Sequence, residues 1–299
     1  MDAVVFPGQG SQRPGMGAPW VGTPSWAVVG ELSEILARDV ASLLLDADAP
    51  TLQATRNAQV AGFALGLVGL DAARRAGLHW EVAAGHSLGE YTALVAVGAL
   101  AVADAARLVG ERAEAMQEAA DASPGTMAAV LGLEPGDVAA CCDEAGGEAW
   151  PANDNAPGQI VVAGTHEGVR RAGEAARSKG GKVLPLSVGG AFHTPLMAGA
   201  QERLDRALGA APFAGAEGAV VTNVDADAHH AASDWSGLLS SQLCLPVRWR
   251  ESILRMEELG VTRVIELGPG AVLAGMVKRT APGLSRAGVA GPDDLAEWA

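Results

Sequence analysis

Residues 85–89 read Gly-His-Ser-Leu-Gly; they follow the short apolar run Val82–Ala84 and precede an alanine-rich segment from Tyr91 to Leu100. The run predicts a strand and the segment predicts a helix. Glycines on both sides of a serine permit a sharp turn that larger side chains would prevent, so the hydroxyl stands where free helix N–H groups stabilise negative charge. Ser87 is therefore a candidate nucleophile for acyl transfer. The structural alternative is a serine N-cap between two packing glycines.

A second glycine-rich loop, Pro7-Gly8-Gln9-Gly10, follows the apolar run Ala3–Phe6. A strand that runs into such a loop is how an open α/β sheet presents backbone amides to a ligand. The loop lacks the Lys-Ser/Thr ending of a phosphate-binding loop and the glycine spacing of a dinucleotide fingerprint. It therefore indicates a binding loop without indicating a nucleotide, and a simple turn is the alternative.

The composition indicates a globular protein. The 299 residues are 49% hydrophobic and 19% charged, and the apolar runs are too short to cross a bilayer. The first residues show neither a basic segment nor a long apolar one, which argues against secretion. This length fits one large domain with a smaller inserted one.

The charge and the cysteines exclude several function classes. The 21 basic and 35 acidic residues give a formal net charge of −14, which argues against a nucleic acid or an anionic membrane as partner. Cys141, Cys142 and Cys244 form neither a disulfide framework nor a metal-ligand pattern. We expect reduced thiols in a cytoplasmic protein, with no metal. Cys244 lacks the glycine elbow and the histidine of a nucleophile, so packing is its expected role.

Two helices are expected, at 55–77 and 102–120. In the second, Leu108, Arg112 and Met116 fall at four-residue steps, so Arg112 shares a face with apolar residues. Burying an unpaired guanidinium is too costly to tolerate. Arg112 therefore binds either a substrate carboxylate or a structural partner such as a core glutamate or carbonyl groups, and its position on the helix leaves both open.

Residues 127–188 predict a separate unit of order β-α-β-β-α-β, which matches a ferredoxin-like split βαβ fold. Its expected strands are 127–131, 149–152, 159–163 and 182–187, and its expected helices are 137–144 and 167–179. Pro124-Gly125 and Gly189-Gly190 are the expected hinges. The predicted division is a large subdomain of residues 1–125 and 189–299 and a small one of residues 126–188, with a ligand cleft between them.

His193 lies just after the second hinge, where the chain re-enters the large subdomain, and is the best partner for Ser87. His86 adjoins the serine, but we expect its ring to point away. The other histidines, His79, His166, His229 and His230, lie in polar or loop-like settings. In the last third of the chain we expect strands at 219–222 and 263–266 and helices at 238–243, 252–259 and through Met276. We expect the tail from Gly283 to be loosely packed.

Six motifs follow one another along the chain: Phe6-Pro7-Gly8-Gln9-Gly10-Ser11-Gln12, Gly85-His86-Ser87-Leu88-Gly89-Glu90, Arg112 with Met116-Gln117, Asn155-Ala156-Pro157-Gly158-Gln159, Ala191-Phe192-His193 and Glu266-Leu267-Gly268-Pro269-Gly270. Together, over almost the whole chain, they closely resemble the malonyl-CoA:acyl-carrier-protein transacylases, acyltransferases of fatty-acid and polyketide synthesis. The resemblance implies an α/β-hydrolase-like large subdomain with a parallel sheet, and a ferredoxin-like small one. It implies no cofactor, because the carrier protein brings its own phosphopantetheine.

The resemblance also implies residue roles. Ser87 would form a malonyl-serine intermediate with His193 as general base and acid, and Arg112 would bind the malonyl carboxylate. Further implied roles are the backbone amides of Gln9 and Leu88 as the oxyanion hole, main-chain carbonyls near Gln242 and Asn223 orienting the histidine, and a substrate pocket that includes His86, Met116, Asn155 and Phe192. Phe192 fits the malonyl-selective pattern of the family rather than the methylmalonyl-selective one. Ala113 and Asp154 depart from the family pattern without removing a catalytic group.

Other interpretations remain open. An acyl or thioester hydrolase would use the same serine and histidine, although it has little use for a buried cation at Arg112. A catalytically inactive scaffold is disfavoured because every expected catalytic residue is present. The resemblance leaves the pathway open, and we expect a monomer whose acidic carrier protein docks on local basic residues: Arg170, Arg171, Arg177, Lys179, Lys182, Lys278 and Arg279.

Overall fold

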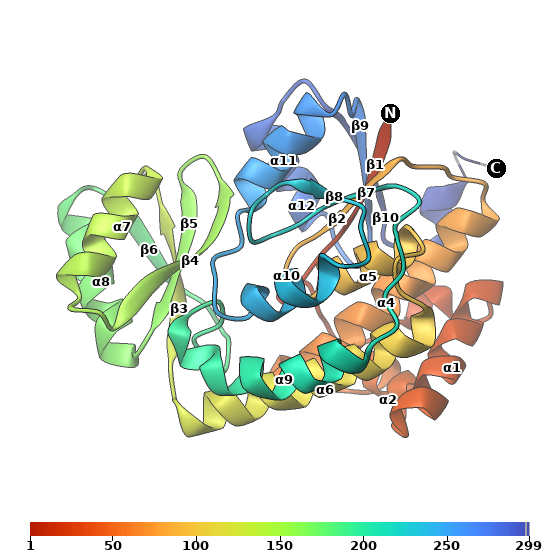
Figure 1. The fold of residues 1–299 in the computed structure, drawn as a ribbon, viewed down its shortest axis with the longest axis horizontal. Coiled ribbons are helices and arrows are strands. Elements are labelled where there is room, and N and C mark those ends of the chain that lie inside the picture. The colour runs from red at the N-terminus through yellow and green to blue at the C-terminus, as the bar shows by residue number, and fades with distance from the viewer. Residues whose placement is uncertain (297, 299) are drawn as a thin grey trace.

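The computed structural model describes residues 1–296 and 298, which form two β-sheets flanked by helices (Figure 1). The larger sheet has the strand order β10-β9-β1-β2-β7-β8. Its first five strands in that order pair in parallel, and only the short β8 runs antiparallel, to β7. The strand bounds are β1 Asp2–Phe6, β2 Val82–Gly85, β7 Ala219–Val221, β8 Ala228–His229, β9 Arg263–Leu267 and β10 Ser285–Val289.

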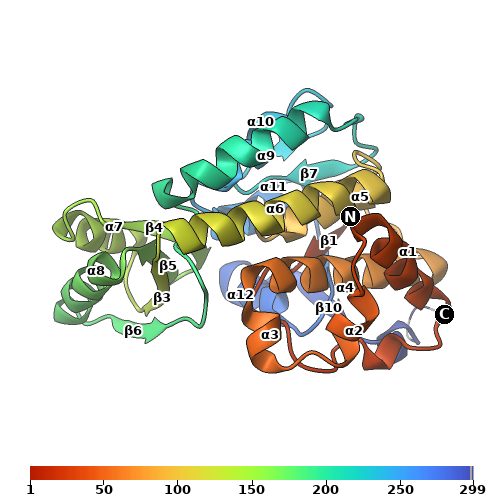
Figure 2. The same ribbon diagram turned by 90° about the horizontal axis from the view of Figure 1, so that it is seen from below.

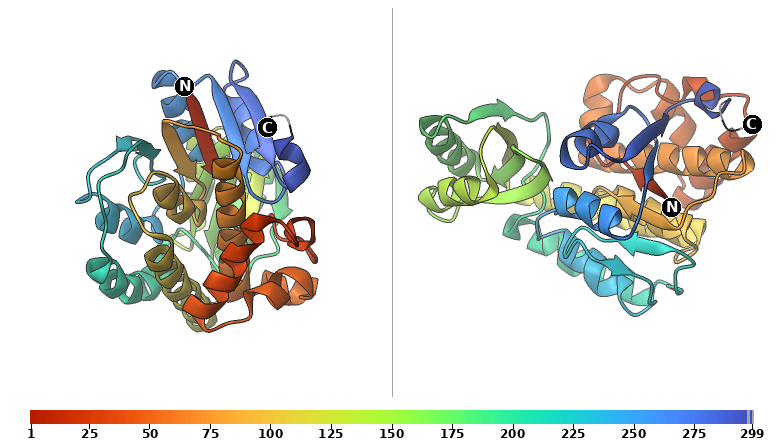
Figure 3. Two further views of the ribbon diagram at one scale, coloured as in Figure 1. Left: turned by 90° about the vertical axis from the view of Figure 1, so that its right-hand side faces the viewer. Right: turned by 90° about the horizontal axis from the view of Figure 1, so that it is seen from above.

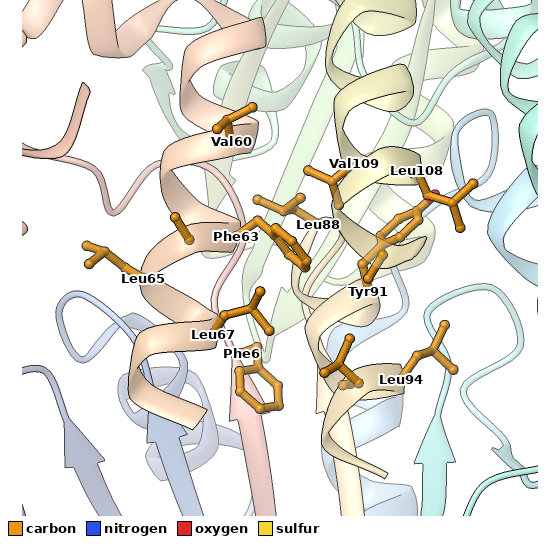
Figure 4. Close-up of a cluster of buried hydrophobic side chains, with 14 of the residues drawn as sticks. Phe6, Val60, Phe63, Leu65, Leu67, Leu88, Tyr91, Leu94, Leu108 and Val109 are labelled. Atoms are coloured by element: carbon orange, nitrogen blue, oxygen red, sulfur yellow. The ribbon is translucent and has the colours of Figure 1, made fainter. Parts of the chain in front are cut away.

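Helices cover both faces of this sheet, so its central strands are apolar on both sides. Val4 and Phe6 of β1 face one core, and Ala3 and Val5 face the other. Figure 4 shows side chains of α4, α5 and α6 in one apolar group, with Phe6 of β1 at its lower end; α11 and α12 cover the opposite face. The helices around this sheet are α1 Ala27–Leu36, α2 Val40–Leu45, α3 Ala49–Gln53, α4 Thr55–Arg75, α5 Gly89–Ala96, α6 Val102–Ala122, α9 Ala198–Ala210, α10 Trp235–Gln242, α11 Trp249–Glu258 and α12 Val272–Thr280. Short 3-10 turns lie at Ala18–Trp20, Pro24–Trp26, Pro195–Met197 and Pro292–Leu295.

The second sheet is antiparallel and has the order β4-β5-β3-β6. Along the chain its elements are β3 Thr126–Leu131, α7 Pro135–Glu144, β4 Ala149–Ala156, β5 Gln159–Gly164, α8 His166–Ser178 and β6 Lys182–Pro185. The expected β-α-β-β-α-β order is present, although β4 runs to 156 rather than 152 and β6 ends at 185. One face packs on α7 and α8 through a separate apolar core that contains Val138, Val162 and Val169. Figure 3 shows this unit standing to one side of the larger sheet.

The chain after Gly283 is not loosely packed, which corrects our expectation. Residues 285–289 form the edge strand β10, which pairs in parallel with β9 over five residue pairs. Leu284 and Val289 are buried, and the Arg263 guanidinium lies 4.4 Å from the centre of the Trp298 ring. The strand was missed because three of its five residues are exposed and it alternates weakly between apolar and polar.

The parallel pairing decides where the site lies. Because β1, β2, β7 and β9 run in the same direction, the loops that follow them meet at one edge of the sheet. Figure 2 shows the long helix α6 passing beside this layer toward the second sheet. The loops after the strands, the middle of α6 and the face of the second sheet thus converge on one region.

Candidate active site

Ser87 lies in a sharp turn between β2 and α5, with φ of +52°. A Cβ atom on Gly85 would overlap the backbone of Gly89, and one on Gly89 would overlap the carbonyl of Phe6. The turn is thus sterically closed to anything but glycine at both positions. The N-cap of α5 is Leu88, and no side chain caps the helix. The structure therefore has the geometry of a nucleophile elbow rather than of a serine cap.

His193 contacts the candidate nucleophile, Ser87, directly. Its Nε2 lies 2.8 Å from Ser87 Oγ, and its Nδ1 lies 2.7 Å from the main-chain carbonyl oxygen of Gln242. Because a carbonyl only accepts, Nδ1 carries the proton and Nε2 is left to accept the serine proton. Burial, followed by the positive charge of Arg112, lowers the pKa of His193 to about 3. The imidazole is therefore neutral at physiological pH, as a general base must be.

Arg112 is fully buried on α6, beside the serine. Its Nη2 donates to Ser87 Oγ at 2.9 Å and to Gln242 Oε1 at 3.0 Å, and its Nη1 donates to Gln59 Oε1. Within the described part of the chain, all these acceptors are neutral oxygens. Of the two structural partners left open, a core glutamate and carbonyl groups, the structure shows the second: the side-chain carbonyls of Gln59 and Gln242 hold the guanidinium. No carboxylate among the described residues pairs with this buried cation, which lies beside Ser87, so its charge favours the binding of an anion there.

The loop after β1 packs against the elbow. A Cβ on Gly8 would come within 2.6 Å of the His86 carbonyl oxygen, so the two loops are in close contact. Within residues 1–296 and 298, the amides of Gln9 and Leu88 donate to no protein acceptor. The Gln9 side chain accepts a hydrogen bond from Gln59 Nε2 at 3.3 Å. Two amides from neighbouring loops are thus available to a ligand oxygen.

A cavity opens over Ser87 and His193. The four residues predicted for the pocket, His86, Met116, Asn155 and Phe192, all line it. The His86 ring is turned to Asn155, with Nε2 2.8 Å from Oδ1, rather than hydrogen-bonded to Ser87. The remaining lining residues are mainly small or apolar: Pro7, Gly8, Gln9, Gly10, Ser11, Gln59, Met127, Asn153, Val161, Leu186, Val188, Val272, Leu273 and Met276.

The chain matches a known protein family over almost its whole length. A family model described as an acyl transferase domain matches residues 3–293. The malonyl CoA-acyl carrier protein transacylase of Bacillus subtilis is 41% identical over 299 residues, covering 98% of this chain and 94% of its own. That of Escherichia coli strain K12 is 38% identical over 305 residues, covering 98% and 97%. The chain belongs to the malonyl CoA-acyl carrier protein transacylase family.

Solved transacylase structures share this architecture. The acyl-carrier-protein S-malonyltransferase of Burkholderia pseudomallei superposes with a TM-score of 0.94 at 40% identity, covering 99% of this chain and 98% of its own. A type II polyketide-synthase acyl carrier protein in complex with its malonyl-transacylase gives 0.94 at 37% identity, covering 98% and 97%. The mainly parallel sheet with a separate antiparallel sheet is thus an arrangement that this chain shares with solved transacylases.

One role implied by the family resemblance needs correction. Gln242 orients the histidine through its carbonyl oxygen, but Asn223 makes no hydrogen bond to His193 within the described residues. Instead, Asn223 Oδ1 accepts the Ser87 N–H at 2.6 Å, and its Nδ2 donates to Gly85 O at 2.7 Å. Gln242 Nε2 also donates to Ser87 O at 3.0 Å. Asn223 therefore holds the turn that carries Ser87.

Two buried polar residues near the site, Gln59 and Glu90, were not predicted. Gln59, on the apolar helix α4, links Arg112 to Gln9. Glu90 accepts the Asn223 backbone N–H at 2.8 Å, and burial raises its pKa to about 7. The signal for Gln59 was available, because it is a polar residue amid Ala58 and Val60, the same anomaly that marks Arg112.

Three further findings concern the described residues. No three or more of their His, Cys, Asp and Glu side chains are grouped so as to hold a metal ion. Every helix among them is too short or too polar to cross a membrane. Cys141, Cys142 and Cys244 have free thiols.

Proposed function

We infer that this protein transfers a malonyl group from malonyl-CoA to an acyl carrier protein, for fatty-acid or polyketide synthesis. The observation that carries the inference is Arg112, a buried cation without a carboxylate partner that lies 2.9 Å from the nucleophile. A malonyl group has a free carboxylate near its thioester carbon, so Arg112 can hold one end while Ser87 attacks the other. The names of the transacylases in the same family agree with this activity.

The first half-reaction forms a malonyl-serine. Ser87 Oγ attacks the thioester carbonyl carbon while its proton passes to His193 Nε2. The resulting oxyanion accepts hydrogen bonds from the amides of Gln9 and Leu88, and loss of one such donor costs about a hundred- to a thousandfold in rate. The tetrahedral intermediate then breaks its C–S bond, and His193 returns the proton to the CoA thiolate. The products are free CoA and the ester on Ser87.

The second half-reaction reverses these roles. The phosphopantetheine thiol of the carrier protein gives its proton to His193 Nε2 and attacks the ester carbonyl. The C–O bond to Ser87 breaks, and the imidazolium returns the proton to Oγ. No protein carboxylate is required in this cycle, because the Gln242 carbonyl fixes the histidine tautomer.

The malonyl carboxylate binds by replacing neutral contacts of Arg112. In the free protein the guanidinium donates to Ser87, Gln59 and Gln242. A carboxylate offers two charged acceptors to the planar guanidinium, and charge-assisted hydrogen bonds are about twice as strong as neutral ones. Phe192, which lines the cavity, limits the space for a substituent on the malonyl carbon. We therefore propose selectivity for malonyl over methylmalonyl.

Carrier docking is part of the same proposal. Among the predicted basic residues, Arg170, Arg171 and Lys179 form ion pairs with glutamates of the same unit, which reduces their attraction for an acidic partner. Arg279 donates to Gln159 Oε1 and Pro157 O. Three cations make neither an ion pair nor a side-chain hydrogen bond within the described residues and are the better candidates: Arg177, Lys182 and Lys278.

We also propose names for the two subdomains, and a cellular setting for the protein. The mainly parallel sheet supports an α/β-hydrolase-like large subdomain of residues 1–125 and 189–299. The antiparallel sheet supports a ferredoxin-like small subdomain of residues 126–188. A cytoplasmic location is supported by the free thiols, and the absence of a nucleic-acid or membrane partner is supported by the acidic charge. We also propose a monomer without a cofactor, on the family resemblance alone.

The test is the intact mass of the protein after brief exposure to malonyl-CoA. We expect a malonyl adduct on the wild type and none on Ser87→Ala. When holo carrier protein is added, the malonyl group should leave the enzyme and appear on the carrier. If no adduct persists and free malonate accumulates whether or not the carrier is present, the protein is a hydrolase. If neither the wild type nor Ser87→Ala reacts with malonyl-CoA, with or without the carrier protein, the transferase assignment fails.

Arg112→Gln should separate malonyl recognition from general acylation. We expect kcat/KM for malonyl loading to fall about a hundred- to a thousandfold, since one partner of a buried charge pair is lost. Arg107→Gln is the matched control, because Arg107 lies on the same helix but is exposed and paired with Asp104; it should leave loading unchanged. Equal losses in the two variants would contradict the role of Arg112.

A further inference from the structure

The side chains of β4 divide between two surfaces. Asn153 and Asn155 line the cavity over Ser87, whereas Asp154, between them, faces helix α11. The pairing of β4 with β5 shifts register between Pro151 and Asn153 and again between Asp154 and Ala156. Such bulges re-aim side chains and weaken the local ladder. This part of the cavity wall therefore depends on contacts from outside its own sheet.

Those contacts come from the segment that leads into α11. The Asp154 N–H donates to Val247 O, and the Val247 N–H donates to Ala152 O, both at 2.9 Å. Arg250 binds the Asp154 carboxylate with two nitrogens: Nε lies 3.0 Å from each oxygen, and Nη2 lies 2.7 Å from Oδ2. The side chains of Arg250 and Asp154 are only 26% and 17% exposed. A two-nitrogen pair of this burial fixes direction as well as distance.

The residues next to this ion pair meet at His86. Asn155, adjacent to Asp154, is hydrogen-bonded to the His86 ring at 2.8 Å. Trp249, adjacent to Arg250, is fully buried, and its ring centre lies 5.6 Å from that of His86. The contacts form a closed circuit from His86 through Asn155 and Asp154 to Arg250 and Trp249, and back to His86. One corner of the circuit is the residue that precedes the nucleophile.

We propose that Asp154 and Arg250 are a positioning pair that fixes the His86–Asn155 wall of the acyl cavity and so helps to determine which acyl group fits. The proposal rests on the proposed function. It assigns to the pair no contact with the reacting atoms. Loss of the pair frees β4 at its bulges, which widens the range of positions that Asn155 and the His86 ring adopt. A looser wall binds malonyl less well and tolerates a bulkier acyl group better.

The experiment is a double-mutant cycle on the full chain with Asp154→Asn, Arg250→Met and the two combined. We expect each single variant to raise the KM for malonyl-CoA about three- to tenfold and to lower discrimination against methylmalonyl-CoA by a similar factor, with kcat little changed. The double variant should be no worse than either single one, because contacting partners are not additive. The proposal would be overturned if the double variant showed the product of the two single effects. It would also be overturned if the single variants left both the KM and the discrimination unchanged.

The chain offers a matched control and an independent readout. Arg263 and Asp2 form another pair between elements, with side chains 39% and 22% exposed, at the opposite end of the parallel strands. Arg263→Ala should leave KM and discrimination unchanged, and an equal effect there would mean that the Asp154 variants act only through stability. The His86 imidazole NMR signal, assigned by its loss in His86→Asn, should shift in Asp154→Asn and not in Arg263→Ala. Because this shift needs no turnover, an unshifted signal refutes the pair even if the proposed reaction is wrong.

Discussion

Ser87 and His193 both have a positive φ, +52° and +60°, which residues other than glycine rarely adopt. Such residues cost about 1–3 kcal/mol each and persist only where the surroundings over-determine them. Asn223 and Gln242 hold the amide and the carbonyl of Ser87, and the Gln242 carbonyl holds His193. Neutral amide groups from distant parts of the chain thus position both Ser87 and His193.

The lowered pKa of His193 predicts the pH dependence of acylation. With a pKa of about 3, the imidazole of the free enzyme stays neutral from pH 5 upward, so kcat/KM for malonyl-CoA should not fall with a midpoint near 6.5. Glu90 also titrates in this range, so the profile should be measured in the Glu90→Gln variant as well as in the wild type. An acid limb near pH 6.5 in both proteins would show that His193 is not shielded from protonation.

Glu90 predicts a pH dependence of stability. Its pKa is raised from 4.5 to about 7 in the folded protein, so between these values the folded state keeps a proton that the unfolded chain releases. Its contribution to stability therefore falls as the pH rises through this window and is constant above it. Glu90→Gln removes this contribution to the slope. The free energy of unfolding of the variant minus that of the wild type should therefore be higher above pH 7 than at pH 4, by up to about 3 kcal/mol. Urea unfolding at pH 4, 6 and 8 measures this, and parallel curves for the two proteins would contradict it.

The elbow between β2 and α5 is set by close backbone approach rather than by helix propensity. We expect Gly89→Ala to destabilise the protein by about 3 kcal/mol or more, because the new Cβ would overlap the Phe6 carbonyl in the adjacent strand. Gly30→Ala in α1 is the matched control, since a Cβ there meets nothing within 4 Å; it should stabilise by about 0.5–1 kcal/mol. Urea midpoints measure both. A Gly89→Ala protein as stable as the wild type would contradict the packing described.

Elements with strong periodicity were predicted well, and those defined by pairing were not. Helices α4 and α6 were predicted at 55–77 and 102–120 and lie at 55–75 and 102–122, because a buried helix face repeats over many residues. Strand β4 was predicted to end at 152 but continues through Asn155 to 156. Its polar continuation is held by bulged pairing and by Val247, and such contacts leave no periodic signal.

The C-terminal segment completes the larger sheet, so removing it should affect the whole molecule. Truncation after Gly283 deletes β10 and exposes the open edge of β9. We expect a lower thermal midpoint and a tendency to associate, measured by calorimetry and size-exclusion chromatography. Truncation after Ala296 keeps β10 and the Pro292–Leu295 turn and serves as the control. Equal behaviour of the two truncated proteins would mean that β10 contributes little.

By itself, the sequence determined the elbow at Ser87, the misplaced cation at Arg112 and the order of most elements, because local sterics and the cost of burying a charge are visible in neighbouring residues. Only the tertiary structure decided that Asn223 holds the serine amide from 136 residues away, that Gln59 reaches Arg112 across 53, and that Arg250 binds Asp154 across 96. These partners meet only after the strand order has brought the strand ends to one edge. Hydrogen bonds of this kind depend on positions in space, which residue types and spacing do not encode locally.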